Sequence, residues 1–330
     1  MTGKRKVWKR RVLAGAIFAL GFTLVFLTET GWFSPMKPWQ ALSGWQEIPS
    51  RQLPGPEVIL TRAGETPQIQ WLGHSGFLIR WHDQTILLDP NLSGHCTVIH
   101  REARNLVEDL NPFEPDLALI SHAHFDHFDI PTLRGIKTLK AVAGPAVLKS
   151  YLGEVAANGT RFSALKPMDS FALGPLKITA VRAVHGGNRF HPIHGGAVAL
   201  GYMIADGETT LYFAGDTGRA MDFTGLGKAF SPDIAILPIG AFRPYWLLRP
   251  HHLSPEDAAA AGKQLGAKVV IPCHFGTFRM AFDPLNEALP RFAKAAEQAG
   301  LAWYVPVWGP FKNLQPGRER STVANASFVN

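Results

Sequence analysis

Cysteine is scarce in this sequence, whose 330 residues include only Cys96 and Cys273. Two thiols cannot build the disulfide framework of a small secreted protein, although one bridge and two free thiols both remain open. Structural zinc sites usually use cysteine ligands, so a purely structural zinc site is not favoured. The sequence also lacks a G-x-S-x-G segment, and nothing in it therefore points to the serine nucleophile of an α/β-hydrolase.

Positive charge is sparse outside the N-terminus. The formal net charge is +7, but six basic residues and no acidic ones lie before residue 12, so the remaining chain is close to neutral. These six residues are Lys4, Arg5, Lys6, Lys9, Arg10 and Arg11. A protein that binds nucleic acid normally needs a basic track for the phosphate backbone. We therefore expect no nucleic-acid partner.

The basic N-terminus is followed by residues 12–27, which are apolar apart from Thr23. As a helix this run is roughly 24 Å long, and its continuation through Trp32 and Phe33 matches the roughly 30 Å hydrocarbon core of a bilayer. The run does not end in the A-x-A pattern of a cleaved signal peptide, which is the alternative. We expect residues 1–33 to form an uncleaved transmembrane signal anchor, with a cytoplasmic N-terminus and an extracytoplasmic (periplasmic) body.

The rest of the chain is predicted to form one domain. Residues 34–66 are rich in proline and glycine and are interpreted as a linker, residues 67–315 as the domain, and residues 316–330 as a tail. Short strand-like runs recur, from 69–81 at one end of the domain to 303–308 at the other. Helices are expected at 255–265, capped by Ser254 with Asp257 in capping-box spacing, and at 284–300, interrupted by Pro290. Two groups of strands with peripheral helices favour an α/β sandwich.

The segment SHAHFDHFD, residues 121–129, carries four metal-ligand types in H-x-H-x-D-H spacing: His122, His124, Asp126 and His127. On an extended strand His122 and His124 would share one side and His127 would oppose them. A single site therefore requires the chain to curl after the strand 117–120. A polar turn with solvated histidines is the alternative, but four such residues in nine positions favour a metal.

Three further candidate ligands lie at strand ends beside glycine: His185, Asp216 and His274. Together with the first four residues they are too many for one metal, and they suit two metals that share a carboxylate. Histidine nitrogen and carboxylate oxygen are ligands of Zn²⁺, and also of Mn²⁺ and Fe²⁺. We expect two divalent metal ions, with Zn²⁺ first among these.

The order H-x-H-x-D-H, His, G-D-T-G and a late His resembles the metallo-β-lactamase superfamily, from about Gln68 to Gly309. LYFAGDTG, HHLSPEDA and HFGTF are similar to the branch that contains N-acylphosphatidylethanolamine-hydrolysing phospholipase D and L-ascorbate-6-phosphate lactonase. The resemblance implies an αβ/βα four-layer sandwich. It also implies a first metal on His122, His124 and His185, a second on Asp126, His127 and His274, and Asp216 as the bridge. His191 and His194 are alternatives to His185, which is preferred because it ends a strand.

The resemblance implies hydrolysis by a hydroxide held between the two metals, with Asp126 relaying the proton. The H-x-E-x-D pattern of the redox-active diiron branch is absent. His252 is expected at the substrate mouth, although it could instead pack at the start of a helix. His74 and Asp89 could orient ligand histidines or could be ordinary polar residues at strand ends.

Aromatic side chains near residue 245 provide a possible acyl-binding wall, namely Phe242, Tyr245 and Trp246, although aromatic residues are more often part of the core. Together with the anchor, they favour a membrane lipid as the substrate and a phospholipase-D-like phosphodiesterase as the activity. A lactonase or small phosphodiester hydrolase is the alternative. A non-catalytic metal-binding membrane scaffold is a third hypothesis, and the complete ligand set argues against it.

Overall fold

The computed structural model describes residues 66–306, except for 104, 106, 157–158 and 190–196. The expected anchor, all but the last residue of the linker, the end of the expected domain and the tail lie outside the described residues, so these boundaries stay predictions. Within the described part of the chain, no helix has the length and apolar character needed to cross a membrane.

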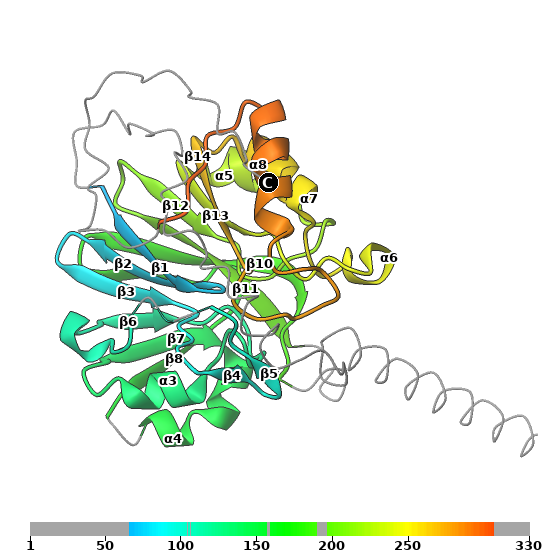
Figure 1. The fold of residues 1–330 in the computed structure, drawn as a ribbon. Helices are drawn as coiled ribbons and strands as arrows, with labels where there is room; N and C mark the ends of the chain where they lie inside the picture. The colour runs from blue at the N-terminus through cyan, green and yellow to red at the C-terminus, as the bar shows by residue number, and fades with distance from the viewer. Residues whose placement is uncertain (1–65, 104, 106, 157–158, 190–196, 307–330) are drawn as a thin grey trace, which may run out of the picture. The chain divides into compact units, whose positions relative to one another are not determined.

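Two six-stranded sheets lie at the centre of the domain (Figure 1). The first has the order β1-β2-β3-β6-β7-β8, with β1 (Gln68–Gly73), β2 (Gly76–Trp81), β3 (Gln84–Leu88), β6 (Leu117–Leu119), β7 (Ala141–Pro145) and β8 (Arg161–Leu165). The second has the order β14-β13-β12-β11-β10-β9, with β9 (Ser170–Leu173), β10 (Leu176–Gly186), β11 (Val198–Ala205), β12 (Thr210–Phe213), β13 (Ile234–Pro238) and β14 (Val269–Cys273).

Each sheet changes from antiparallel to parallel pairing across its width. β1, β2 and β3 pair antiparallel, whereas β3, β6, β7 and β8 pair parallel. In the second sheet β9 to β12 pair antiparallel, and β12, β13 and β14 pair parallel. Parallel strands require crossover connections, which here contain helices, and the loops after their carboxyl ends are where α/β sheets usually bind ligands.

Helices cover the outer face of each sheet (Figure 1). The first sheet packs against α3 (Ile130–Gly135), η2 (Ala146–Tyr151) and α4 (Gly153–Ala156). The second packs against α5 (Phe223–Phe230), α7 (Pro255–Leu265) and α8 (Ala288–Gln298). Three short elements lie in the connections: the hairpin of β4 (His95–Cys96) and β5 (Ile99–His100), η1 (Asn111–Phe113) and α6 (Tyr245–Leu248).

Alternating side chains explain why the layers form. In β2, Phe77 and Ile79 belong to the core cluster shared with the second sheet, whereas Leu78 belongs to the cluster beneath α3 and α4. Phe77 meets Phe213 of the second sheet with ring centroids 6.5 Å apart. Every residue of β13 and β14 is buried, as expected for parallel strands covered on both faces. The expected αβ/βα sandwich is therefore confirmed.

The individual elements differ from the sequence predictions in three places. The run 69–81 is a hairpin of two strands rather than one strand, because Gly73 and His74 turn the chain with positive φ angles. The run 303–308 contributes only an isolated bridge at Trp303 among its described residues. The helix expected at 284–300 begins at Ala288, so Pro290 lies in its first turn, where a missing N–H breaks no helical hydrogen bond.

The structure confirms one predicted helix and decides between the two alternatives for the cysteines. The helix expected at 255–265 is confirmed as α7, with Ser254 at its N-cap and a complete capping box to Asp257. Cys96 and Cys273 are both buried free thiols, which excludes a disulfide between them.

Candidate metal centre

The segment 121–129 curls as soon as it leaves β6. The backbone N–H groups of His127 and Phe128 donate to the carbonyl of His124, at 3.2 and 2.8 Å. Asp129 then caps α3 by accepting a hydrogen bond from the N–H of Thr132. The turn brings the rings of His122 and His127 to a centroid distance of 4.2 Å, although an extended strand would point them to opposite sides.

His122, His124 and His185 form a first group of potential ligands, whose donor atoms all lie within 4.8 Å of one another. Nδ1 of His124 lies 2.9 Å from Nε2 of His122 and 3.2 Å from Nε2 of His185. The structure therefore places His185, near the end of β10, with the other two histidines. The alternatives His191 and His194 lie outside the described residues.

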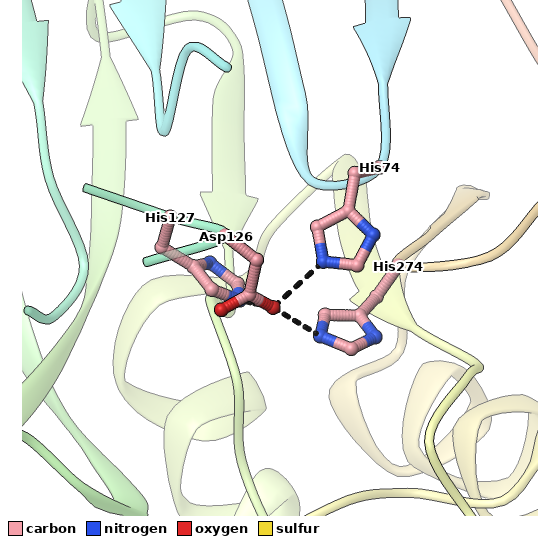
Figure 2. Close-up of side chains that lie close together, drawn as sticks. All are labelled: His74, Asp126, His127 and His274. Atoms are coloured by element: carbon pink, nitrogen blue, oxygen red, sulfur yellow. Dashed lines mark hydrogen bonds and ion pairs between the residues drawn. The ribbon is translucent and has the colours of Figure 1, made fainter. Parts of the chain in front are cut away.

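His74, Asp126, His127 and His274 form a second group and point toward one another in Figure 2. Oδ2 of Asp126 lies 2.8 Å from Nε2 of His74 and 3.4 Å from Nε2 of both His127 and His274. His74 comes from the tight turn between β1 and β2. From the sequence, His74 could orient a ligand histidine or could be an ordinary polar residue at a strand end. In the structure its ring lies among the potential ligands and contacts the carboxylate of Asp126.

Asp216 lies between the two groups. Its Oδ2 atom is 3.2 Å from Nε2 of His127 and of His274 in the second group, and 3.8 Å from Nε2 of His185 in the first. The preceding Gly215 has φ +58°, and a Cβ there would lie 2.6 Å from Cβ of Ser121. A side chain at position 215 would therefore separate the loop after β12 from the histidine segment. One carboxylate contacts both groups, as a bridging ligand must.

Asp89 orients His127. It lies directly after β3, and its Oδ2 atom is 2.7 Å from Nδ1 of His127 while its Oδ1 atom accepts a hydrogen bond from the backbone N–H of Ser121. With Nδ1 held in this way, Nε2 of His127 faces Asp126 and Asp216. Such a carboxylate partner on the far nitrogen is typical of metal-binding histidines.

Thr277 has a positioning role that the sequence analysis missed. The backbone N–H of His74 donates to Oγ1 of Thr277 at 2.6 Å, and the carbonyl of His74 accepts from the backbone N–H of His274 at 2.9 Å. These bonds hold His74 at φ +52°, a conformation that a non-glycine residue rarely adopts. The sequence offered one signal for this role: Thr277 is a polar residue in the segment HFGTF, which directly follows a buried strand.

The electrostatics of the site are dominated by buried carboxylates. Burial alone would raise the pKa of Asp126 and Asp216, but the surrounding histidines outweigh it and hold both pKa values well below the usual range. Burial alone would lower the pKa of His127 and His274, but the same carboxylates raise the pKa of His127 well above its ordinary value and that of His274 to about 9. Protons on these two rings therefore balance the two carboxylates.

Four other histidines of the site have lowered pKa values and are neutral near pH 7. Burial lowers the pKa of His122 and of His185 well below the ordinary value, and lowers that of His74 to about 3 and that of His252 to about 4. A neutral imidazole has a free nitrogen lone pair, which is the form that binds a metal.

These residues fit divalent cations. Nε2 of His127, Nε2 of His274 and Oδ1 of Asp216 are buried without a hydrogen-bond partner, which is uncommon for polar atoms in a protein interior. Histidine nitrogen and carboxylate oxygen are also the ligand set of Zn²⁺, Mn²⁺ or Fe²⁺. His122, His124 and His185 could hold one cation, and Asp126, His127 and His274 another, with Asp216 in reach of both.

The structure places the residues expected to contact substrate in three different environments. His252 lines a pocket of about 200 Å³ together with the potential ligands His124, Asp126, Asp216 and His274. Tyr245 and Trp246 lie on α6 and are 39% and 73% exposed. The prediction for Phe242 was wrong: its ring is only 2% exposed and packs in the core beneath the guanidinium of Arg291. It therefore cannot form part of an open acyl-binding wall.

Comparison with known proteins identifies the family. Residues 84–275, more than half of the chain, match the family model of the β-lactamase superfamily domain. The chain therefore belongs to the metallo-β-lactamase superfamily, and it is a metal-dependent hydrolase of that superfamily.

Particular relatives support this assignment. The chain is 29% identical over 253 residues to a UPF0173 metal-dependent hydrolase of Methanopyrus kandleri, an alignment that covers 75% of this chain and 99% of the relative. It is 30% identical to one of Desulforamulus reducens, covering 70% and 92%. A solved metallo hydrolase of Ignicoccus hospitalis shares the fold, with a TM-score of 0.55 and 24% identity over 76% of this chain and 96% of that structure.

Cation binding should displace protons from this site. The pKa of His274 is raised to about 9, so near neutral pH this ring carries a proton that a cation bound through Nε2 must replace. His127, whose pKa is raised well above its ordinary value, must give up a proton in the same way. Apparent affinity should therefore rise between pH 6 and pH 8, by about tenfold per pH unit for each proton displaced. Titration calorimetry in buffers of different ionisation enthalpy measures both quantities. An affinity independent of pH, with no proton released, would contradict this charge balance.

Proposed function

We propose that this protein is a membrane-anchored, binuclear phosphodiesterase of the phospholipase D type, acting on N-acylphosphatidylethanolamine-like lipids on the extracytoplasmic side of the membrane. The observation that carries the proposal is an apolar rim beside the metal centre. Among the described residues, five large hydrophobic side chains are exposed: Val98, Met168, Tyr245, Trp246 and Leu247. Four of the five are close in the chain to residues that line the pocket, Val98 next to Thr97 and the other three directly before Leu248, whereas Met168 is not.

The rim is continuous in sequence with the pocket on both sides. Leu248 at the end of α6 lines the pocket, and the three exposed residues directly before it belong to the same helix. Thr97 of the β4–β5 hairpin also lines the pocket, and the next residue, Val98, is 62% exposed. We name Val98, Tyr245, Trp246 and Leu247 the apolar rim. Tryptophan and tyrosine are favoured where one end of the ring is apolar and the other is wet, as at a membrane interface.

The size of the pocket indicates how a lipid would divide between pocket and rim. About 200 Å³ is less than the roughly 300 to 1,000 Å³ of typical small-molecule sites. A scissile phosphodiester fits this space, whereas acyl chains must lie outside it, against the apolar rim. The guanidinium of Arg249 lies 5.0 Å from the ring of Tyr245, where its charge favours an anionic lipid surface.

Bound divalent cations would supply Lewis acidity at the phosphoryl oxygens and would lower the pKa of a water molecule to around 7. The protein's own residues then have separate tasks. Asp126, oriented by Nε2 of His74, is the carboxylate best placed to relay the proton of the attacking water. Water forms a new bond to phosphorus while the bond from phosphorus to the N-acylethanolamine oxygen breaks, and that oxygen takes up a proton.

His252 is placed to contact the substrate rather than to act as a strong acid. Its side chain is 14% exposed, and its Nδ1 atom, which has no hydrogen-bond partner, lies 3.7 Å from Oδ2 of Asp216. Because burial lowers its pKa to about 4, the ring is neutral near pH 7. A neutral ring can donate or accept one hydrogen bond and so position the phosphodiester.

The same pocket volume favours a second candidate, a lactonase or a hydrolase of small phosphodiesters, because a small polar substrate fits the pocket without using the rim. The apolar rim has no role in that reaction. A non-catalytic scaffold is less favoured, because all seven potential ligands expected from the sequence converge on one site.

A substrate panel tests the proposal directly. Cation-loaded protein should release phosphatidic acid and N-acylethanolamine from vesicles that contain N-acylphosphatidylethanolamine, and His122→Ala should lose this activity because it removes a ligand from the first group. Mass spectrometry of the products is the measurement. Turnover of lactones or small phosphodiesters, with no phosphatidic acid from any phospholipid, would instead support the second candidate.

The apolar rim gives a second prediction. Trp246→Ser should reduce hydrolysis of vesicle-bound lipid about tenfold or more, because it removes the most exposed apolar anchor of the rim, of the order of 1.5–3 kcal/mol if the ring is buried in lipid. Hydrolysis of a water-soluble phosphodiester should be unchanged. Met168→Ser is the matched control, since Met168 is also exposed but lies between β8 and β9, outside the pocket. Equal loss on both substrates would show that the rim does not contact lipid.

A further inference from the structure

The curled segment that carries four of the potential ligands has few regular backbone bonds of its own. Apart from the turn at His124, its contacts within the described residues come largely from other parts of the chain. The backbone N–H of Ala123 donates to the carbonyl of Gly187 at 3.1 Å, and the side-chain amide of Asn91 donates to the carbonyl of Asp126 at 3.3 Å. The placement of its histidines therefore depends on nonlocal contacts.

Arg189 makes two of these contacts at once. Its Nη1 atom donates to the carbonyl of Ala123 at 3.2 Å and to the carbonyl of Phe128 at 2.9 Å. These two carbonyls lie before and after His124, Asp126 and His127 in the chain. One guanidinium therefore bonds to the curled segment on both sides of these three residues.

The guanidinium is also enclosed by aromatic rings. Its central carbon lies 4.0 Å from the ring centroid of Phe125, 5.3 Å from that of Phe128 and 5.5 Å from that of Tyr151. A planar guanidinium can stack on a ring and donate hydrogen bonds in its plane at the same time, whereas a lysine ammonium cannot do both. The geometry is therefore specific to arginine rather than to positive charge.

Arg189 also connects the two segments that supply the first ligand group, namely the curled segment and the end of β10. His185 lies four residues before Arg189 at the end of β10, and Gly187 between them bonds to the curled segment. We propose that Arg189 is a positioning residue for the metal centre, which fixes the curled segment 122–128 against the end of β10 and so sets the distance between His185 and the ligands on the curl.

Cation binding by the full chain tests this proposal, and it does not depend on which substrate is hydrolysed. Arg189→Lys keeps the charge but loses the stacked, planar donor, so we expect Zn²⁺ affinity to fall about 10- to 100-fold, the usual effect of losing a residue that supports metal ligands. We also expect the visible absorption of bound Co²⁺ to change in energy or intensity. The matched control is Arg182→Lys, an exposed arginine within β10, which should leave both unchanged.

The thermal stability of the cation-free variants separates positioning from general folding. A lower melting temperature of Arg189→Lys, combined with wild-type Zn²⁺ affinity and a wild-type Co²⁺ spectrum, would overturn the proposal, because Arg189 would then support the fold alone. Unchanged affinity at unchanged stability would overturn it as well. Weaker affinity with an altered Co²⁺ spectrum in a folded Arg189→Lys protein is the result that supports it.

Discussion

Two buried carboxylates facing one another across a cluster of histidines are the constraint on which the rest of this site depends. Asp126 and Asp216 are 4% and 1% exposed, and each lies within 3.4 Å of Nε2 of both His127 and His274. An ionised carboxylate in a protein interior costs several kcal/mol unless a positive charge or several hydrogen bonds compensate it. Protons on His127 and His274 can do so, and divalent cations can do so more completely. The site is therefore built to hold positive charge.

The sandwich provides the geometry that this constraint requires. Asp89, Asp216 and His274 all follow the ends of strands, and the curled segment follows the end of β6. Because strands end at fixed positions in a packed sheet, residues directly after them are held more precisely than residues in the middle of a long loop. The apolar rim, by contrast, comes from two short connecting elements, α6 and the β4–β5 hairpin. The superfamily fold explains hydrolysis by a metal centre, whereas in the proposed function these connecting segments determine the choice of substrate.

Much of the site could be predicted from sequence because its signal is local. His122, His124, Asp126 and His127 occur within six positions, and the remaining ligands each follow an apolar run that ends beside glycine. His74 could not be placed in this way, since its contact with Asp126 spans 52 residues and depends on a turn within a run that was predicted as one strand. Phe242 was misjudged because an aromatic residue beside exposed ones has the same local pattern whether it is buried or not. Arg189 gave no signal, because its role depends on carbonyl groups that only the folded curl presents.

The central claim is that two groups of ligands share Asp216 and together hold two divalent cations. Metal analysis of the purified, metal-replete chain, by mass spectrometry with protein concentration measured independently, tests it most directly. The account predicts two cations per chain, and fewer in a variant that lacks Asp216, such as Asp216→Asn. A wild-type chain that holds one cation or none under saturating conditions would contradict it.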